Sequence, residues 1–182
     1  DEHASLAAML QSMRMLVEKG PGDGRKPFFD VVRAMLFYID EYPERLHHPK
    51  ESNLLFPKVV KASPKVLGAV DRLERDHMYS EKAARELQHL LLSWELLGPS
   101  RRAAFEEALQ KYVDFYLDHM HLEEDVILPE AEKTLSAQEW AEIDAAFEQN
   151  ADPLTGKYPP KGEYENLFSL IVQRAPAPIG LG

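Results

Sequence analysis

The 182-residue sequence has no cysteine, no long apolar run and a shortage of positive charge. Without cysteine, the chain cannot form a disulfide framework, a thiolate metal site or a cysteine nucleophile. Its 31 acidic and 21 basic residues give a formal net charge of −10. Nucleic acids and anionic membrane surfaces both need a basic face, so we expect neither as a partner. No apolar stretch approaches the roughly 18 residues of a membrane span.

The composition is otherwise that of a globular protein. Hydrophobic residues make up 45% of the chain and charged residues 29%, and the length suits one well-cored domain with an appended tail. The opening residues "DEHASL" resemble neither a signal peptide nor a tag. Together with the lack of cysteine, this leads us to expect a cytoplasmic protein.

Glycine and proline divide the chain into long helical stretches. Breaks fall at residues 20–24, at Pro57 with 63–65, and at 98–100, and the stretches between them show apolar residues at spacings of three and four. The predicted helices span 3–20, 27–46, 64–97 and about 101–128, with Ser63 and Ser100 as caps of the last two. A capping box at 136–139 starts a fifth helix near 137–149, a short helix follows at 164–174, and 175–182 reads as an extended tail.

This pattern predicts an all-α protein, because no segment shows strand alternation. Residues 1–130 are expected to form an up-down-up-down four-helix bundle, and residues 131–182 a helical extension packed outside it. Pro43 and Pro49 are awkward inside the second helix. We expect a kink or break there, with Pro49 starting a fresh turn that carries Glu51.

One phrase occurs twice. "HHPKESNLLFP" at 47–57 and "HMHLEEDVILP" at 119–129 both read His, three residues, Glu, five residues, Pro. Upstream, "DEH" at 1–3 matches "RDH" at 75–77, and the intervals between the paired histidines are 44 and 42 residues. The bundle therefore consists of two related helical hairpins.

Helix geometry brings the repeated residues to one level. Each histidine lies about 17–20 residues from the nearest turn, or about 25–30 Å at roughly 1.5 Å per residue. The four should meet at the end of the bundle away from the Gly20 and Gly98 turns. A glutamate four residues after a histidine shares its helix face. The predicted cluster comprises His3, His47, Glu51, His77, His119 and Glu123.

Burying two carboxylates in a helical core costs several kcal/mol for each unless cations accompany them. Imidazole and carboxylate without sulfur suit iron, with manganese as the alternative, better than structural zinc. The competing interpretation is a set of surface histidines beside ordinary helix acids. It would explain one such pair, but two matching pairs with matching upstream histidines favour a metal site.

At these residues the chain resembles the hemerythrin-like family, the HHE cation-binding domains, over roughly residues 1–130. The resemblance implies two iron ions, oxo- or hydroxo-bridged, with Glu51 and Glu123 bridging them and each histidine capping one. Oxygen carriers of this family have another histidine where this chain has Glu81, and an aspartate five residues after the last histidine, where this chain has Glu123 at four and Asp125 nearby. Reversible oxygen storage is therefore not expected.

Other residues have simpler interpretations. His48 and His121 lie off the face of the site and are expected either to contact the ligands or to be exposed, and His89 reads as a surface residue. Glu81 shares the face of His77, so it is either a seventh ligand or an exposed acid. Tyr112, Phe115 and Tyr116 are expected to form an apolar floor or ordinary core. Glu-x-x-His at 44–47, 74–77 and 86–89 raises a ferritin-like alternative, but helix 4 lacks that motif.

Two function classes follow. The first is binding and reaction of a small diatomic ligand or peroxide (oxygen, peroxide or nitric oxide) at a non-haem di-iron site. The second is a non-catalytic iron or oxygen sensor, in which residues 130–182 report to a partner. The pattern carries no signal for oligomeric state. About two coordination positions stay open once the six residues and a bridge are counted on two six-coordinate ions, which favours reaction over storage.

Overall fold

The computed structural model describes residues 2–182, so Asp1, the start of the predicted bundle, lies outside the described part. α-Helices account for most of the chain, and residues 2–182 contain no strand. The α-helices are α1 (Glu2–Lys19), α2 (Arg25–Ile39), α3 (His48–Lys50), α4 (Phe56–Ala62), α5 (Leu67–Leu97), α6 (Arg102–Leu122), α7 (Leu128–Thr134), α8 (Ala137–Glu148) and α9 (Glu165–Arg174). Three π-helical segments, Asp40–His47, Glu51–Leu55 and Glu123–Ile127, connect α2 to α3, α3 to α4 and α6 to α7, and 3-10 turns occur at Pro64–Val66, Pro99–Arg101, Pro153–Thr155 and Gly162–Tyr164.

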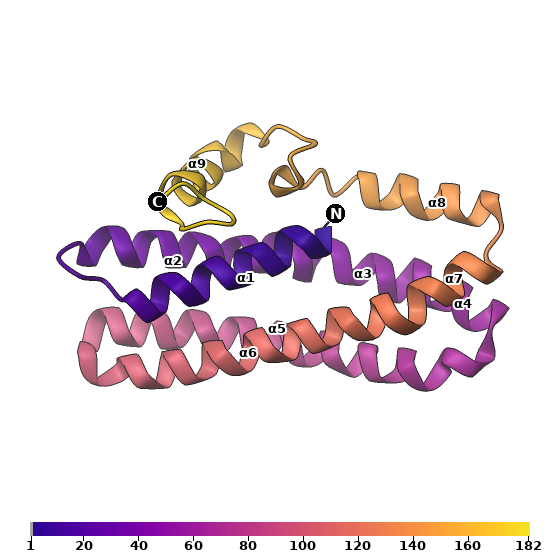
Figure 1. The fold of residues 1–182 in the computed structure, drawn as a ribbon, viewed down its shortest axis with the longest axis horizontal. Coiled ribbons are helices and arrows are strands. Elements are labelled where there is room, and N and C mark those ends of the chain that lie inside the picture. The colour runs from indigo at the N-terminus through magenta and orange to yellow at the C-terminus, as the bar shows by residue number, and fades with distance from the viewer. Residues whose placement is uncertain (1) are drawn as a thin grey trace.

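The helices form an antiparallel bundle, which confirms the predicted fold class (Figure 1). Three continuous helices, here called columns, run the full length of the bundle: α2 to α4, α5, and α6 to α7. The shorter α1 covers only the half near the turns. Beyond the start of α1, α8 lies over the other half, while α9 packs over α2. Among the described residues, no helix combines the length and the apolar character that crossing a bilayer requires.

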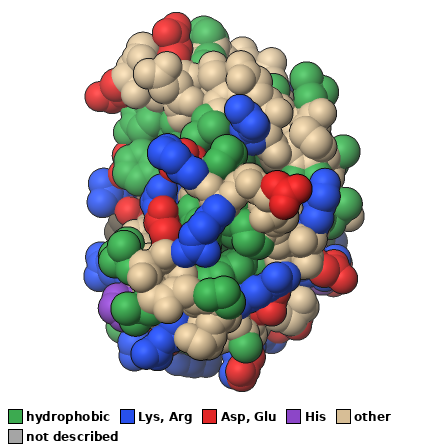
Figure 2. Space-filling view, turned by 90° about the vertical axis from the view of Figure 1, so that its left-hand side faces the viewer, with side chains coloured by type: hydrophobic (Ala, Val, Ile, Leu, Met, Phe, Trp, Pro, Cys, Tyr) green, Lys and Arg blue, Asp and Glu red, His purple; other side chains and the backbone are tan. Residues whose placement is uncertain are grey.

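The core has two parts, one in each half of the bundle. The larger contains Trp94, Phe29 and Phe105 near the turns. The smaller, built around Phe56 and Ile127, also takes Ile143 of α8. The extension therefore packs outside the bundle as predicted, and α8 adds Ile143 to the second core. Figure 2 faces the end with the Gly20 and Gly98 turns, where side chains of both charges mix with apolar ones.

The prolines do not end the helices, but Pro49 stands in a fresh turn that leads to Glu51, as predicted, after a π-helical segment that contains Pro43. The second helix continues through Pro43, Pro49 and Pro57 and ends only at Ser63, and the helix begun at α6 continues through Pro129 to Thr134. Pro49, Pro57 and Pro129 each stand in the first turn of an α-segment that follows a π-segment or joins one. A proline is tolerated at the start of a helix because it has no N–H to leave unpaired.

The predicted helix ends are partly right. Gly20, at a φ of 75°, closes α1, and Ser136 forms the predicted capping box with Glu139. Ser63 precedes its helix but does not cap it, because its hydroxyl donates to Glu130 at 2.8 Å. Ser100 lies inside the Pro99–Arg101 turn and makes no cap.

The C-terminal residues are not the predicted extended tail. The backbone N–H of Leu181 donates to the carbonyl of Val172 at 2.8 Å, and that of Gly182 donates to the carbonyl of Ala175 at 3.0 Å. The chain end is thus folded back on α9, because these backbone groups find partners at the helix end instead of in solvent.

Candidate metal centre

All six predicted site residues meet in one cluster. His3 comes from the first turn of α1 and His77 from the middle of α5. The two His-x-x-x-Glu phrases lie where the long columns change into π-helix, so that each glutamate begins a π-segment. Glu51 and Glu123 are only 2% and 1% exposed, which places their carboxylates inside the bundle.

The Nε2 atoms of the four histidines point at the two carboxylates. On Glu51, an oxygen lies 2.7 Å from His47 Nε2 and the other oxygen 3.2 Å from His77 Nε2. On Glu123, the corresponding distances are 2.9 Å to His119 and 3.1 Å to His3. Each carboxylate therefore faces one histidine of its own hairpin and one of the other hairpin.

The other ring nitrogen of each histidine faces an oxygen, which forms a hydrogen bond at His3, His47 and His77 and a longer contact without a hydrogen bond at His119. Within the hairpins, Glu2 lies 2.5 Å from His47 Nδ1, and Asp76 lies 3.5 Å from His119 Nδ1. Glu2 directly precedes His3, and Asp76 directly precedes His77. In each hairpin, the acid of the repeated acidic-His pair thus contacts the histidine of the other helix. The prediction used that pair only as a mark of the repeat and assigned no role to the acid.

The remaining two rings are oriented across the hairpins. Glu124 lies 3.1 Å from His3 Nδ1, and the Ser52 hydroxyl lies 3.0 Å from His77 Nδ1. These two residues follow Glu123 and Glu51 in the sequence, so the arrangement is two-fold like the repeat. Oxygen partners on Nδ1 leave Nε2 available, which is how metal-ligating histidines are usually oriented.

Charge holds this cluster together. Burial on its own would lower the pKa of His3, but the hydrogen bonds and charges of Glu123 and Glu51 outweigh it and raise that pKa to about 11. Burial would raise the pKa of Glu51, but the His47 charge and the bond to His3 hold that pKa well below its usual range. In the absence of cations, protons on the histidines balance the carboxylates.

The nitrogen and oxygen atoms of the cluster are placed to bind metal ions, because several of them form no hydrogen bond with one another. Seven buried atoms have no hydrogen-bond partner: His47 Nε2, His77 Nε2, His119 Nε2 and Nδ1, Glu51 Oε2, Asp76 Oδ2 and Glu123 Oε1. Two sets of four potential ligand atoms each lie within 4.8 Å of one another: His3, His47, Glu51 and Glu123 form one set, and His48, Glu51, His77 and His119 the other. Buried polar atoms without partners are costly, and cations between them would remove that cost.

His48 is not off the site as the helix angle predicted. It is 5% exposed, and its ring stacks on that of His77 with centroids 4.1 Å apart. The π-segment before it widens the turn, so the simple 100° spacing used in the prediction does not hold. His48 Nδ1 lies 3.1 Å from Glu44, and its Nε2 lies 2.7 Å from the Tyr116 hydroxyl.

The predicted apolar floor is a polar network. The Glu44 carboxylate accepts hydrogen bonds from the hydroxyls of Ser80 and Tyr112, the latter at 3.2 Å. Sequence reasoning overlooked Glu44 because it considered this residue only as part of a ferritin-like Glu-x-x-His motif with His47. In the structure Glu44 contacts His48, the residue after His47. The ferritin-like alternative therefore loses its Glu44–His47 pair.

The remaining candidates lie outside the cluster. Glu81 is exposed and pairs with Arg85, so it is not a seventh ligand here. His89 is exposed as predicted, and His121 and Asp125 are exposed too. The cluster itself lies between the two cores and not at the end of the bundle, because the columns continue for about three turns past it.

Comparison with known proteins identifies the family. The model of the hemerythrin HHE cation-binding domain matches residues 1–131, which is most of the chain. The chain therefore belongs to the hemerythrin family of HHE cation-binding domains, as its motifs predicted. No curated protein and no solved structure gave a significant match.

Proposed function

We propose that the cluster holds two metal ions, with His3, His47, Glu51, His77, His119 and Glu123 as ligands. The observation that carries this proposal is the pair of four-atom sets that share Glu51. His48 belongs to one of these sets but is left out of the proposed ligands, because its two ring nitrogens contact Glu44 and Tyr116. A carboxylate common to two sets is what a bridging ligand requires. The two-fold arrangement of the ring partners supports it, since each half of the cluster prepares its histidines in the same way.

Iron is the proposed metal, and manganese the alternative. The donors are imidazole nitrogens and carboxylate oxygens, and the chain has no cysteine to supply sulfur. Such a donor set suits iron and manganese, and membership of this family supports a cation at these residues. An iron pair would supply one-electron and two-electron redox chemistry toward oxygen, peroxide or nitric oxide.

The chain's own residues prepare the site for that chemistry. Glu2, Ser52 and Glu124 contact Nδ1 of three rings at hydrogen-bond distance, and Asp76 lies 3.5 Å from Nδ1 of the fourth. Apolar rings keep solvent from two of the four. Phe147 lies edge-on to His47 at 5.2 Å, and Phe56 stacks on His77 at 5.7 Å between centroids. Rigid rings in an apolar setting keep the donor atoms in place when a charge changes in the site.

Reaction, and not reversible storage, is the proposed outcome of contact with oxygen or peroxide. Glu81 stands where the carriers have a further histidine, and it turns to Arg85 on the surface. The site thus offers four clear imidazole ligands and leaves positions for an incoming oxidant, as the count of coordination positions predicted.

Metal analysis tests the ligand assignment. We expect the double variant His47→Ala, His119→Ala to lose stoichiometric iron, because each change removes an Nε2 within 2.9 Å of a shared carboxylate. The matched control is His89→Ala, an exposed histidine of the same chain, which should keep its metal. Full metal content in the double variant would refute the assignment.

Oxygen exposure tests the reactivity. The reduced, iron-loaded protein should oxidise irreversibly when oxygen is added, followed by its absorption spectrum. Glu81→Ala should react at the same rate, since its side chain is exposed and away from the cluster. Oxygen uptake that reverses fully under vacuum would contradict this proposal.

A sensor without turnover is the second candidate, and one contact favours it. The Asn150 amide donates to the Glu2 carboxylate at 3.0 Å, and Glu2 orients His47. Lys50 also donates to Asn150, so the segment after α8 is joined directly to the cluster. If iron-loaded protein turns over neither peroxide nor nitric oxide but changes its binding to a partner, this candidate replaces the first.

A further inference from the structure

A cavity of about 490 Å³ opens directly onto the cluster. His3, His47, Glu51 and Glu123 form its inner wall. A water molecule occupies about 30 Å³ in the liquid, and pockets for small organic ligands measure roughly 300–1,000 Å³. The cavity is therefore far larger than oxygen, peroxide or nitric oxide needs.

The extension builds half of this cavity. Eight of the sixteen lining residues lie beyond residue 131, the last residue matched by the family. Trp140, Ile143 and Phe147 of α8 face Leu55 and Leu128 of the bundle across it. These side chains give the cavity an apolar interior, and the cavity is a property of this chain's extension as much as of the family domain.

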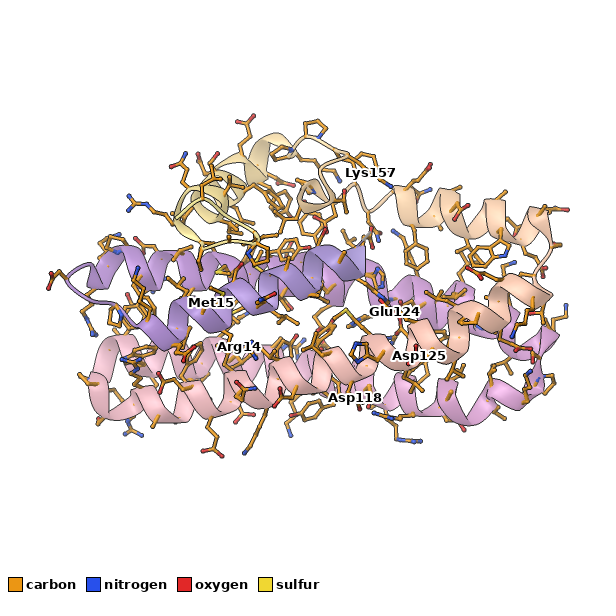
Figure 3. The ribbon with its side chains drawn as sticks, viewed as in Figure 1. Arg14, Met15, Asp118, Glu124, Asp125 and Lys157 are labelled. Atoms are coloured by element: carbon orange, nitrogen blue, oxygen red, sulfur yellow. The ribbon has the colours of Figure 1, made fainter. Side chains whose placement is uncertain are left out.

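The mouth of the cavity is acidic. Glu124, Asp144 and Glu148 line it and are exposed, against one exposed cation, Lys157. Figure 3 shows Glu124 on the bundle and Lys157 on the opposing segment after α8. With a net charge of −10 on the whole chain, this rim repels anions and attracts cations.

We propose that the cavity binds a small organic molecule with an apolar body and a positively charged head, such as a primary amine, and holds it beside the cluster. The apolar body lies against Trp140 and Phe147, and the charged head lies at the acidic rim. The inference rests on the proposed function only in naming the ligand as the partner of the metal site. Binding to the cavity itself does not require metal.

Three probes of equal chain length test the ligand class: hexylamine, hexanol and hexanoate, titrated into metal-free protein by calorimetry and by tryptophan fluorescence. We expect hexylamine to bind most tightly and hexanoate least. Trp140→Phe should abolish the fluorescence change, although Trp94 remains, because Trp94 lies in the other core. Absence of hexylamine binding, or tighter binding of hexanoate, would overturn the proposal.

A charge reversal tests the rim. Asp144→Lys should weaken hexylamine binding by about three- to tenfold, as expected for one nearby charge in a mostly aqueous setting. Glu132→Lys is the matched control, since Glu132 is exposed on α7 and does not line the cavity. Equal weakening by both variants would show a nonspecific charge effect and overturn the assignment to this cavity.

A spectrum of the iron-loaded protein tests the link to the metal site. Hexylamine should shift the visible absorption of the loaded protein in wild type, and Asp144→Lys should need more ligand for the same shift. A bound amine that leaves the spectrum unchanged would overturn the link. Protein that binds hexylamine but takes up no metal would defeat the proposed function alone, and metal-loaded protein that binds no amine would defeat this inference alone.

Discussion

At the residue scale, a histidine serves a metal only when its ring is held in one orientation. In the proposed metal site, Glu2 would do this for His47 through a 2.5 Å hydrogen bond, and Asp76 lies at the equivalent place in the other hairpin, 3.5 Å from His119 Nδ1. We expect Glu2→Gln and Asp76→Asn each to weaken metal affinity by roughly 10–100-fold, the usual effect of losing an oxygen that orients a ligand. Equilibrium competition with a chelator measures this change.

The control for this prediction is Glu18→Gln, an exposed acid on the same helix as Glu2. It removes one negative charge without touching a histidine, so its metal affinity should match that of wild type. Equal weakening in Glu2→Gln and Glu18→Gln would mean that net charge, and not ring orientation, sets the affinity.

Single residues also show what the sequence could reveal about the site. All six cluster residues were found from the repeat, because the spacing of four fixes a helix face whatever lies around it. The ring partners Ser52 and Glu124 carried no such signal, since any polar residue after a glutamate looks like surface. The burial of His48 against His77 was left open, because it depends on a π-segment that no residue pattern in the phrase indicates.

At the element scale, Ser136 forms the helix cap that the sequence predicted, whereas Ser100 does not. Ser136 caps α8 through a complete capping box, so Ser136→Ala should lower the free energy of unfolding by about 1 kcal/mol. Ser100→Ala should change it by less than about 0.5 kcal/mol, because this exposed serine makes no cap. Urea denaturation of both variants measures the difference, and equal losses would restore Ser100 as a cap.

The elements themselves were largely predictable, and their ends were not. Apolar spacing located α1, α5, α8 and α9, and Gly20 marked a true end. Pro57 and Pro129 were expected to mark helix ends. Each instead follows a π-helical segment, and the helix continues past it.

At the scale of the whole molecule, the cluster lies between two cores and connects both with the extension. Without cations, the buried Glu51 carboxylate is stabilised by the raised pKa values of His3 and His47. Metal that binds the folded chain adds about 2.7 kcal/mol of stability at a free concentration 100 times its dissociation constant. We therefore expect chelation to lower the melting temperature, as measured by calorimetry.

Removal of the metal should also be felt in the extension, because His47, Glu2 and Asn150 form a continuous series of contacts. Metal bound at His47 would fix this ring, and through Glu2 the Asn150 contact, in one position, whereas without metal only hydrogen bonds restrain them. We expect faster amide hydrogen exchange around residues 149–158 in metal-free protein, while α9, which packs over α2, keeps its protection. In Asn150→Ala the extension is already uncoupled, so its exchange should not respond to metal. Equal exchange of residues 149–158 with and without metal in the wild-type protein would contradict this coupling and remove the support for a sensing role.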